Sequence, residues 1–439
     1  MTVELPALPA HWGKSRVDRV ASVNARIGWK ALTAAEYQPQ GFTFLSTPNI
    51  KGREIDFDNV NYITEFRYQE SPELKLREGD VLLAKDGNTL GIVNIVKHLP
   101  RPATVNGSIA VIRPIGVDGA FLRYVLESRV TQASINMLKG GMGVPHLFQW
   151  DINRLPIPVP PLKEQRRIAE FLDAETATIE SYANLHEQLF SALREKTSGV
   201  IESLLLYGHT QPQNDVPIAD SAPFPSRFPI GRLKNVAARV DVGIAEAATH
   251  AYASDGVPLI RSTNIRSNSL DVRDLLHITP PFAERNRSKY VFAGDILTVR
   301  TGNAGVSAVV PQDLNRSQTF TQLITTLRDE NSPEYFCQFL NSRVCRQYFE
   351  LVSWGSAQKN ISVPLLANTP VPIPPIELQR EISASIENYS EAASSLASKV
   401  NKARQLASER RQALITAAVT GQFDVSTASG RNVTDGVTA

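Results

Sequence analysis

Two copies of one segment decide the fold of this chain. The first reads Ile157-Pro158-Val159-Pro160-Pro161-Leu162-Lys163-Glu164-Gln165-Arg166-Arg167-Ile168, and the second reads Val371-Pro372-Ile373-Pro374-Pro375-Ile376-Glu377-Leu378-Gln379-Arg380-Glu381-Ile382. Proline fixes φ and pushes the preceding residue out of the helical region, so each proline strip is expected to be extended. We interpret each strip as an edge strand and linker that marks a domain boundary.

A long helix is predicted after each strip. Residues 162–207 contain no proline and one glycine, and residues 377–420 contain neither. Apolar residues recur at alternating spacings of four and three, which is typical of a coiled coil. The seam positions are Ile168, Leu172, Glu175, Ile179, Tyr182, His186, Leu189, Leu193, Lys196 and Val200 in the first helix, and Ile382, Ile386, Tyr389, Ala393, Leu396, Val400, Ala403, Ala407, Arg410, Leu414 and Ala417 in the second. His186 is interpreted as a partly solvated seam residue, not a ligand.

The similarity between the two halves extends beyond the strips. Gly79-Asp80-Val81-Leu82 recurs as Gly294-Asp295-Ile296-Leu297, at an offset of 215 residues. After one missing residue near Ala304 the offset is 214, at which Ser128-Arg129-Val130 recurs as Ser342-Arg343-Val344. A fixed offset with one small gap indicates an internal duplication.

The order of elements is the same in each copy. Short apolar runs bounded by Gly, Asn and Asp predict strands, and residues 120–138 and 333–351 have helical patterns. We expect an α+β fold with two tandem-repeat domains, separated by two long antiparallel coiled-coil helices and related by pseudo-two-fold symmetry. The predicted domains are residues 1–161 and 216–376, the helical spacers are 162–215 and 377–423, and 424–439 form a disordered tail.

Such an arrangement would act as a ruler. Each helix is at most roughly 65 Å long at about 1.5 Å per residue. Antiparallel pairing would hold the two domains at opposite ends, and paired reading heads with a fixed spacing suit the local two-fold symmetry of duplex DNA. Because the two domains differ in sequence, we expect an asymmetric bipartite target with a spacer of fixed length. The helices could instead pair with those of a partner, which would make the ruler intermolecular.

Charge and composition are compatible with this interpretation. Basic residues exceed acidic ones by 18 to 15 in residues 1–161 and by 16 to 12 in 225–376, which suits a phosphate-rich partner. No apolar run is long enough to predict a membrane span. Cys337 and Cys345 cannot form a disulfide framework, so we expect reduced thiols and a cytoplasmic protein.

The proline–glutamine segments resemble the start of the conserved regions in specificity subunits of type I restriction–modification enzymes. Residues 410–423 are similar to the closing helix of that family, and Gly355-Ser356-Ala357-Gln358-Lys359-Asn360-Ile361 resembles the segment that often precedes the proline strip. The first copy departs from it with Gly141-Met142-Gly143-Val144-Pro145-His146-Leu147, so a DNA role of Gln358 or Lys359 does not transfer to that copy.

The resemblance implies that residues 1–161 and 216–376 are target-recognition domains for double-stranded DNA. It also implies two modification (methyltransferase) subunits as partners, which bind S-adenosylmethionine, and restriction (motor–nuclease) subunits, which use ATP and Mg. No cofactor is expected in this chain. The sequence has no phosphate-binding loop, adenine-methyltransferase motif, Gly-x-Ser-x-Gly elbow or metal-ligand spacing. We therefore expect a non-catalytic DNA-reading subunit; the alternative is a coiled-coil scaffold that binds protein and does not read DNA.

Three groups of residues are predicted to contact DNA, because cations and amides on turns suit phosphate oxygens or base edges. The first is the tip after the Gly-Asp strand, with Lys85 and Asn88 in one copy and Arg300 and Asn303 in the other. The others are Asn49 with Lys51, repeated as Asn264 with Arg266, and Gln358 with Lys359. The alternatives are a plain hairpin turn with a solvated cation, a turn-capping Asn, and a local turn, respectively.

Overall fold

The computed structural model describes residues 4–25, 33–140, 144–210, 224–246, 249–352 and 360–425. The chain divides into two compact units: residues 1–187 with 401–439 form unit 1, and residues 188–400 form unit 2. Each unit contains one end of each long helix, because the lobe cores extend into the helix pair. The predicted bounds of the domains and helical spacers stay a prediction.

Unit 1 contains one globular lobe, residues 4–161 (lobe 1). A four-stranded antiparallel sheet has the order β2-β8-β5-β6, and a three-stranded sheet has the order β4-β3-β7. The strands are β1 (Gly13–Arg16), β2 (Ala21–Asn24), β3 (Phe42–Leu45), β4 (Asn61–Ile63), β5 (Val81–Ala84), β6 (Val93–Ile95), β7 (Ala103–Val105), β8 (Ile109–Pro114) and β9 (Pro156–Val159). The helices are α1 (Val17–Val20), α2 (Glu65–Gln69), α3 (Gly119–Glu127), α4 (Arg129–Leu138) and α5 (Gln149–Asn153).

Unit 2 contains the second lobe, residues 224–375 (lobe 2), with the same plan and a larger second sheet. Its four-stranded sheet has the order β11-β21-β18-β19, and its five-stranded sheet has the order β12-β16-β13-β20-β17. The strands are β10 (Ile230–Arg232), β11 (Ala237–Val242), β12 (Tyr252–Ala253), β13 (Val257–Ile260), β14 (Ile265–Arg266), β15 (Ser269–Leu270), β16 (Leu276–Ile278), β17 (Tyr290–Val291), β18 (Ile296–Thr298), β19 (Ser307–Val309), β20 (Ser317–Thr319), β21 (Leu323–Leu327) and β22 (Pro370–Pro372). The helices are α7 (Leu233–Val236), α8 (Pro280–Arg285), α9 (Pro333–Asn341), α10 (Arg343–Val352) and α11 (Val363–Ala367).

The four-stranded sheets of the two lobes confirm the duplication. The strand that follows the Gly-Asp pair has equivalent neighbours in both lobes. In lobe 1, β5 lies between β8 and β6, and in lobe 2, β18 lies between β21 and β19. The predicted α+β class is therefore confirmed for both copies. The proline strips form β9 and β22, which pair antiparallel with β1 and β10 in two-stranded ribbons. Proline is tolerated there because a ribbon has free edges that need no N–H donor.

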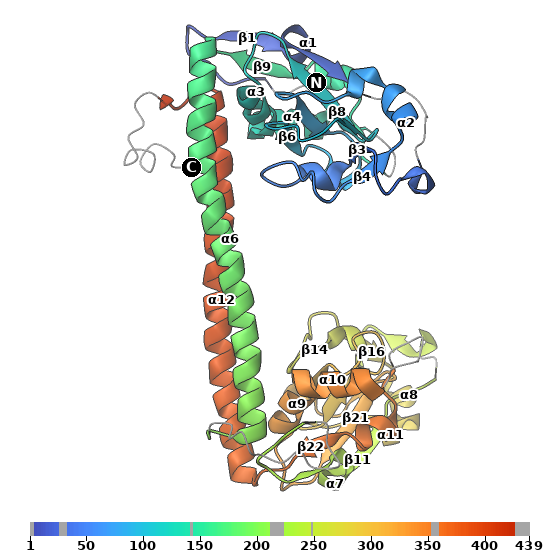
Figure 1. Ribbon diagram of the computed structural model, residues 1–439. Helices are drawn as coiled ribbons and strands as arrows, with labels where there is room; N and C mark the ends of the chain where they lie inside the picture. Colours follow the sequence, from blue (N-terminus) through green and yellow to red (C-terminus); the bar gives the residue numbers. More distant parts are fainter. Residues whose placement is uncertain are drawn as a thin grey trace. The chain divides into compact units, whose positions relative to one another are not determined.

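The two long helices are α6 (Leu162–Tyr207) and α12 (Ile376–Val419), and they lie side by side in antiparallel orientation (Figure 1). In unit 1 Arg411 forms an ion pair with Glu180, and Arg404 forms one with Glu187. Seven residues further along α6, the partner lies seven residues earlier in α12, as antiparallel helices require. In unit 2 Leu205 and Leu206 of α6 share a core with Ile382 and Ile386 of α12. Both predicted helices and their pairing within one chain are confirmed.

The seam between the helices differs in part from the predicted one. Ile168, Leu172, Ile382, Ile386, Val400 and Leu414 are buried as expected. Tyr182, Leu189 and Leu396 are exposed instead, by 59%, 46% and 45%, and the next residue in each case is the less exposed: Ala183, Phe190 and Ala397. A strict 3.5-residue pattern drifts around an α-helix of 3.6 residues per turn, which accounts for the change of register.

A buried glutamine in each repeated segment joins three elements. Gln165 lies in the first turn of α6 and is 1% exposed. Its Nε2 donates to the Pro160 carbonyl at 2.8 Å, and its Oε1 accepts from the Asp118 N–H at 2.8 Å. Asp118 is the N-cap of α3. One side chain thus fixes the proline strip, the start of α6 and the start of a lobe helix.

The second copy repeats this junction. Gln379 is equally buried, donates to the Pro374 carbonyl and accepts from the Ser332 N–H, both at 2.8 Å. Ser332 is the N-cap of α9, the counterpart of α3. Both lobes are therefore attached to their long helices by the same hydrogen bonds.

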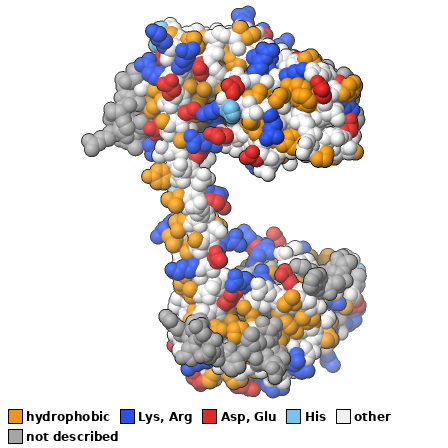
Figure 2. All heavy atoms as spheres, in the orientation of Figure 1, with side chains coloured by type: hydrophobic (Ala, Val, Ile, Leu, Met, Phe, Trp, Pro, Cys, Tyr) orange, Lys and Arg blue, Asp and Glu red, His pale blue; other side chains and the backbone are white. Residues whose placement is uncertain are grey.

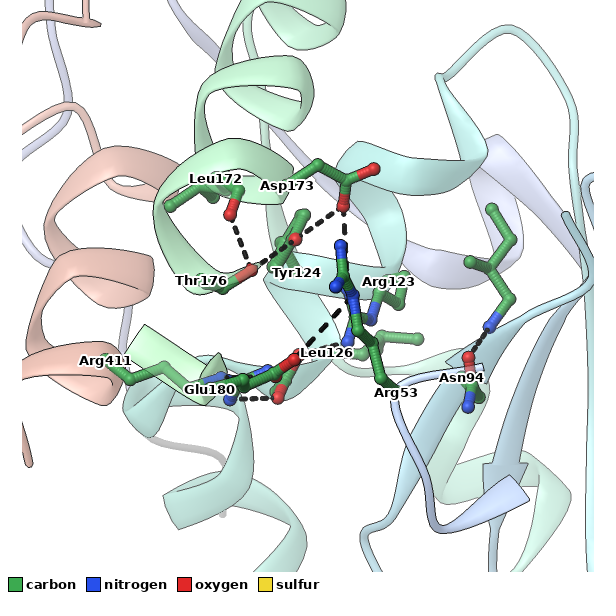
Figure 3. Close-up of polar contacts among 12 residues, drawn as sticks. Arg53, Asn94, Arg123, Tyr124, Leu126, Leu172, Asp173, Thr176, Glu180 and Arg411 are labelled. Atoms are coloured by element: carbon green, nitrogen blue, oxygen red, sulfur yellow. Dashed lines mark hydrogen bonds and ion pairs between the residues drawn. The ribbon is translucent and has the colours of Figure 1, made fainter. Parts of the chain in front are cut away.

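Lobe 1 also has ion pairs with the helices (Figure 3). Arg411 of α12 contacts Glu127 of α3 at 2.5 Å and Glu180 of α6 at 3.1 Å. Asp173 of α6 accepts a hydrogen bond from Tyr124 at 2.6 Å (Figure 3). It accepts a second one from Lys97 at 2.7 Å. Burial raises the pKa of Tyr124 to about 12, so its phenol stays a donor at neutral pH.

We predict that Gln165→Leu and Gln379→Leu each lower the free energy of unfolding by about 1–3 kcal/mol, because a buried N–H and a carbonyl lose their partner. Chemical unfolding of the full chain measures this loss. Lys163→Ala, at an exposed position of the same turn, is the control and should leave stability unchanged. An unaltered midpoint in both leucine variants would contradict the proposed role of the junction.

We predict that Arg411→Met lowers the free energy of unfolding by about 1–3 kcal/mol, because Glu127 and Glu180 lose a partly buried counter-ion. Arg404→Ala is the matched control, since it removes an exposed ion pair from the same helix. Its effect should stay below about 0.5 kcal/mol. Equal losses in thermal unfolding would show that the burial of the Arg411 cluster has no energetic consequence.

Candidate nucleic-acid interface

The predicted tip is the turn that joins β5 to β6 in lobe 1 and β18 to β19 in lobe 2. Gly87 and Gly302 have φ of +68° and +79°, a left-handed conformation that favours glycine. Asn88 and Asn303 follow these glycines and are exposed. The hairpin geometry expected from the sequence is therefore present in both copies.

In lobe 1 the tip is held by the segment that precedes α5. Asp86 and His146 form a β-bridge, and the Leu147 N–H donates to the Lys85 carbonyl at 2.9 Å. The side chains of Asp86 and His146 also share a hydrogen bond. The Lys85 ammonium lies 3.0 Å from the Asp86 carboxylate. The tip is thus held by polar contacts between two segments that lie 60 residues apart in the sequence.

Lobe 2 has the same backbone contact but different side chains. Thr301 and Asn360 form the β-bridge, and the Ile361 N–H donates to the Arg300 carbonyl at 3.0 Å. The Arg300 Nε donates to the Asn360 Oδ1 at 3.1 Å. The tip therefore lies against the end of the segment that contains the third predicted group; Gln358 and Lys359 themselves lie outside the described residues.

The environment of Lys85 differs from that expected for a cation on a hairpin tip. This lysine is 5% exposed and its ammonium is engaged with Asp86, so it is not a solvated cation at a hairpin tip. Arg300 at the equivalent position is partly exposed. In each lobe we call the segment that forms a bridge to the tip, through His146 in lobe 1 and Asn360 in lobe 2, the closing segment. Lys85 is buried more deeply beside its closing segment than Arg300 is.

The asparagines of the second predicted group are internal. Asn49 is 6% exposed, accepts from the Ser46 N–H at 2.8 Å and donates to the Asn59 carbonyl at 2.8 Å. Asn264 is 3% exposed and makes the equivalent bonds to Arg261 and Asp271, both at 3.0 Å. These contacts are the ones that the turn-capping alternative requires.

The cations that follow these asparagines are available on the surface. Lys51 is exposed, and Arg266 is exposed with its guanidinium 3.7 Å from the Asp271 carboxylate. On the face shown in Figure 2, Lys and Arg side chains are interspersed with Asp and Glu in both units. This face is therefore not uniformly basic.

Exposed aromatic residues beside the lobe 1 tip were not predicted. Phe148 and Trp150 are 48% and 54% exposed, with rings nearly parallel at a centroid distance of 6.2 Å. His146 packs edge-on against Phe148 at 4.5 Å. The equivalent positions in lobe 2, at offset 214, are Ser362 and Pro364. This difference between the two copies is the feature of the sequence from which the aromatic pair could have been predicted.

Other chemistry is sparse in the parts of the chain that the structure describes. No group of three or more His, Cys, Asp or Glu residues is placed to hold a metal there. Cys337 and Cys345 are buried and unpaired, and burial raises the pKa of both thiols. Within the same residues, no helix combines the length and apolar character needed to cross a bilayer.

Comparison with known proteins identifies a family. A family model described as a type I restriction modification DNA specificity domain matches residues 9–190 and 246–403. The EcoKI specificity subunit of Escherichia coli K12 is 22% identical over 95% of this chain and 90% of its own length. The putative MjaX specificity subunit of Methanocaldococcus jannaschii is 20% identical over 97% and 96%.

Solved structures share the fold. A chain from a structure on complex assembly and conformational transition of the type I restriction–modification system matches with a TM-score of 0.72 at 17% identity, covering 95% of this chain and all of that one. The HsdS subunit of Thermoanaerobacter tengcongensis matches with a TM-score of 0.50 at 17% identity, covering 96% of this chain and all of that one.

We predict that Asn49→Ala and Asn264→Ala act on stability and not on DNA contact. Each variant leaves a buried N–H and a carbonyl without their side-chain partner, which should cost about 1–2 kcal/mol in the free energy of unfolding. Thermal unfolding measures the loss, and Asn88→Ala, an exposed amide on the tip, serves as the control. Unchanged stability together with lost DNA binding would instead assign these asparagines to the interface.

Proposed function

The chain belongs to the family of type I restriction–modification DNA specificity proteins, and on that premise we propose that it reads an asymmetric bipartite DNA sequence, with one half-site for each lobe. The paired helices α6 and α12 would set a spacer of fixed length between the half-sites. Each recognition lobe would approach the duplex with the tip that follows β5 or β18.

One observation carries this proposal: the two lobes repeat the same scaffold but differ at the tip. In lobe 1 Asp86 contacts both Lys85 and His146, and in lobe 2 Arg300 is hydrogen-bonded to Asn360. Base-edge contacts specify a sequence, whereas phosphate contacts position the protein. Unlike tips on a repeated scaffold support unlike half-sites, and the exposed aromatic pair of lobe 1 adds to the difference.

Positions that the lobes share suit the phosphate backbone. Lys51 and Arg266 occur at equivalent positions and both are exposed. A cation can contact a phosphate beside any base, so these two side chains would orient each lobe without reading sequence. Asn88 and Asn303, also equivalent and exposed, would contact the same backbone or a groove edge.

We further propose that the chain docks two methyltransferase subunits and, through the complete assembly, motor–nuclease subunits in the cytoplasm. S-adenosylmethionine, ATP and Mg would be bound by those subunits. This chain would supply recognition and no catalytic group. The rival function, a coiled-coil scaffold that binds only protein, shares the helix pair but gives no reason for two unlike tips.

The test is DNA binding by the full chain assembled with the modification subunits of the same host, and by the chain alone. We predict that log Kd changes linearly with log salt concentration between about 50 and 200 mM. Lys51→Ala and Arg266→Ala should each weaken binding to all duplexes and reduce the salt slope by about 1. Fluorescence anisotropy with labelled duplexes provides both quantities.

Arg77→Ala is the matched control, because Arg77 is exposed but precedes β5, at the end of the strand away from the tip. Its slope and affinity should equal those of the unmodified chain. Absence of DNA binding under every condition, with the modification subunits bound, would support the protein-only scaffold.

A further inference from the structure

Lobe 2 has a groove beside its tip, between the β18–β19 turn and helix α10. Its volume is about 350 Å³, and its lining includes Asn303 from the turn, Arg346 and Phe349 from α10, and Asn360 from the closing segment. All of these residues belong to unit 2. The groove is therefore a feature of one lobe, formed where three segments of that lobe meet.

Close packing against one glycine positions the Phe349 ring of this groove. Gly305 has φ of +93°, and a Cβ at this position would lie 3.0 Å from the ring of Phe349. Phe349 is 4% exposed and forms an apolar floor. Asn360, on the wall formed by the closing segment, is fixed by its hydrogen bond from Arg300. The walls are thus positioned by packing and hydrogen bonds before any ligand arrives.

Arg346 is the feature that distinguishes this groove from the same place in lobe 1. Its equivalent at offset 214 is Gln132, whose Nε2 donates to the carbonyls of Gly91 and Leu126, both at 2.8 Å. Gln132 therefore serves the fold of lobe 1. Arg346 is an exposed cation on the corresponding turn of α10. Equivalent positions of the two lobes thus hold an amide that stabilises the fold in lobe 1 and an exposed cation in lobe 2.

We propose that Arg346 is a specificity-determining residue that reads a guanine in the half-site of lobe 2. The guanidinium presents parallel N–H donors that match the O6 and N7 acceptors of guanine in the major groove, a pairing that no other base offers. Its place beside the tip lets it reach a base edge while Asn303 contacts the adjacent backbone. The assignment rests on the proposed DNA-reading function of the tips and adds a base identity to it.

The experiment replaces each guanine of the recognised duplex, one at a time, by 7-deazaguanine, which lacks the N7 acceptor. Binding is measured for the full chain assembled with its modification subunits. We expect one guanine, in a single half-site, whose replacement weakens binding by roughly 5- to 150-fold. In Arg346→Ala, the same replacement should have little further effect, because the contact is already absent.

Arg287→Ala is the matched control, an exposed arginine of the same lobe outside the groove lining; it should keep the full effect of 7-deazaguanine. Arg346→Gln, which installs the residue of lobe 1, provides a second variant, and its unfolding temperature should match that of the unmodified chain. If binding is normal but no 7-deazaguanine weakens it, or if Arg346→Ala keeps the full effect, the assignment is wrong while DNA reading stands. Absence of specific binding by the unmodified assembly would overturn the proposed function together with this assignment.

Discussion

The two hydrogen bonds of one buried glutamine are the constraint on which the rest of the structure depends. Gln165 and Gln379 each tie a proline carbonyl to the N-cap backbone of a lobe helix, at the first turn of α6 or α12. A buried amide cannot abandon such partners without leaving polar groups unsatisfied. Each long helix is therefore fixed relative to the sheet that precedes it, and each lobe core continues into the helix pair.

This rigid attachment separates positioning from reading. The repeated parts, namely the Gly-Asp strands, the buried capping asparagines and the glutamine junctions, form the scaffold of each lobe. The parts that differ lie around the tip: His146 with Asp86 and the Phe148–Trp150 pair in lobe 1, and Arg346 with Asn360 in lobe 2. A duplicated scaffold can thus present two unlike surfaces, which is what an asymmetric target requires.

The sequence predicted the scaffold well because duplication and periodicity are properties of the chain itself. The offset of 215 and then 214 residues, the proline strips and the bounds of α6 follow directly from it. The surroundings of the tip could not be predicted in the same way. Lys85 is buried beside Asp86, which forms a bridge to His146 60 positions along the chain. The helix seam shifts by one residue at Tyr182, Leu189 and Leu396, because a 3.5-residue pattern drifts around an α-helix. Arg346 was not predicted as a site residue, because nothing in the sequence around it distinguishes it from other exposed arginines on helices.

The most direct test of the central claim is a map of methylated adenines in DNA from a host that produces this chain with its modification subunits. We predict one asymmetric motif in two parts, separated by a spacer of constant length. A single undivided motif, a spacer of variable length, or two identical half-sites would contradict the assignment of one unlike half-site to each lobe.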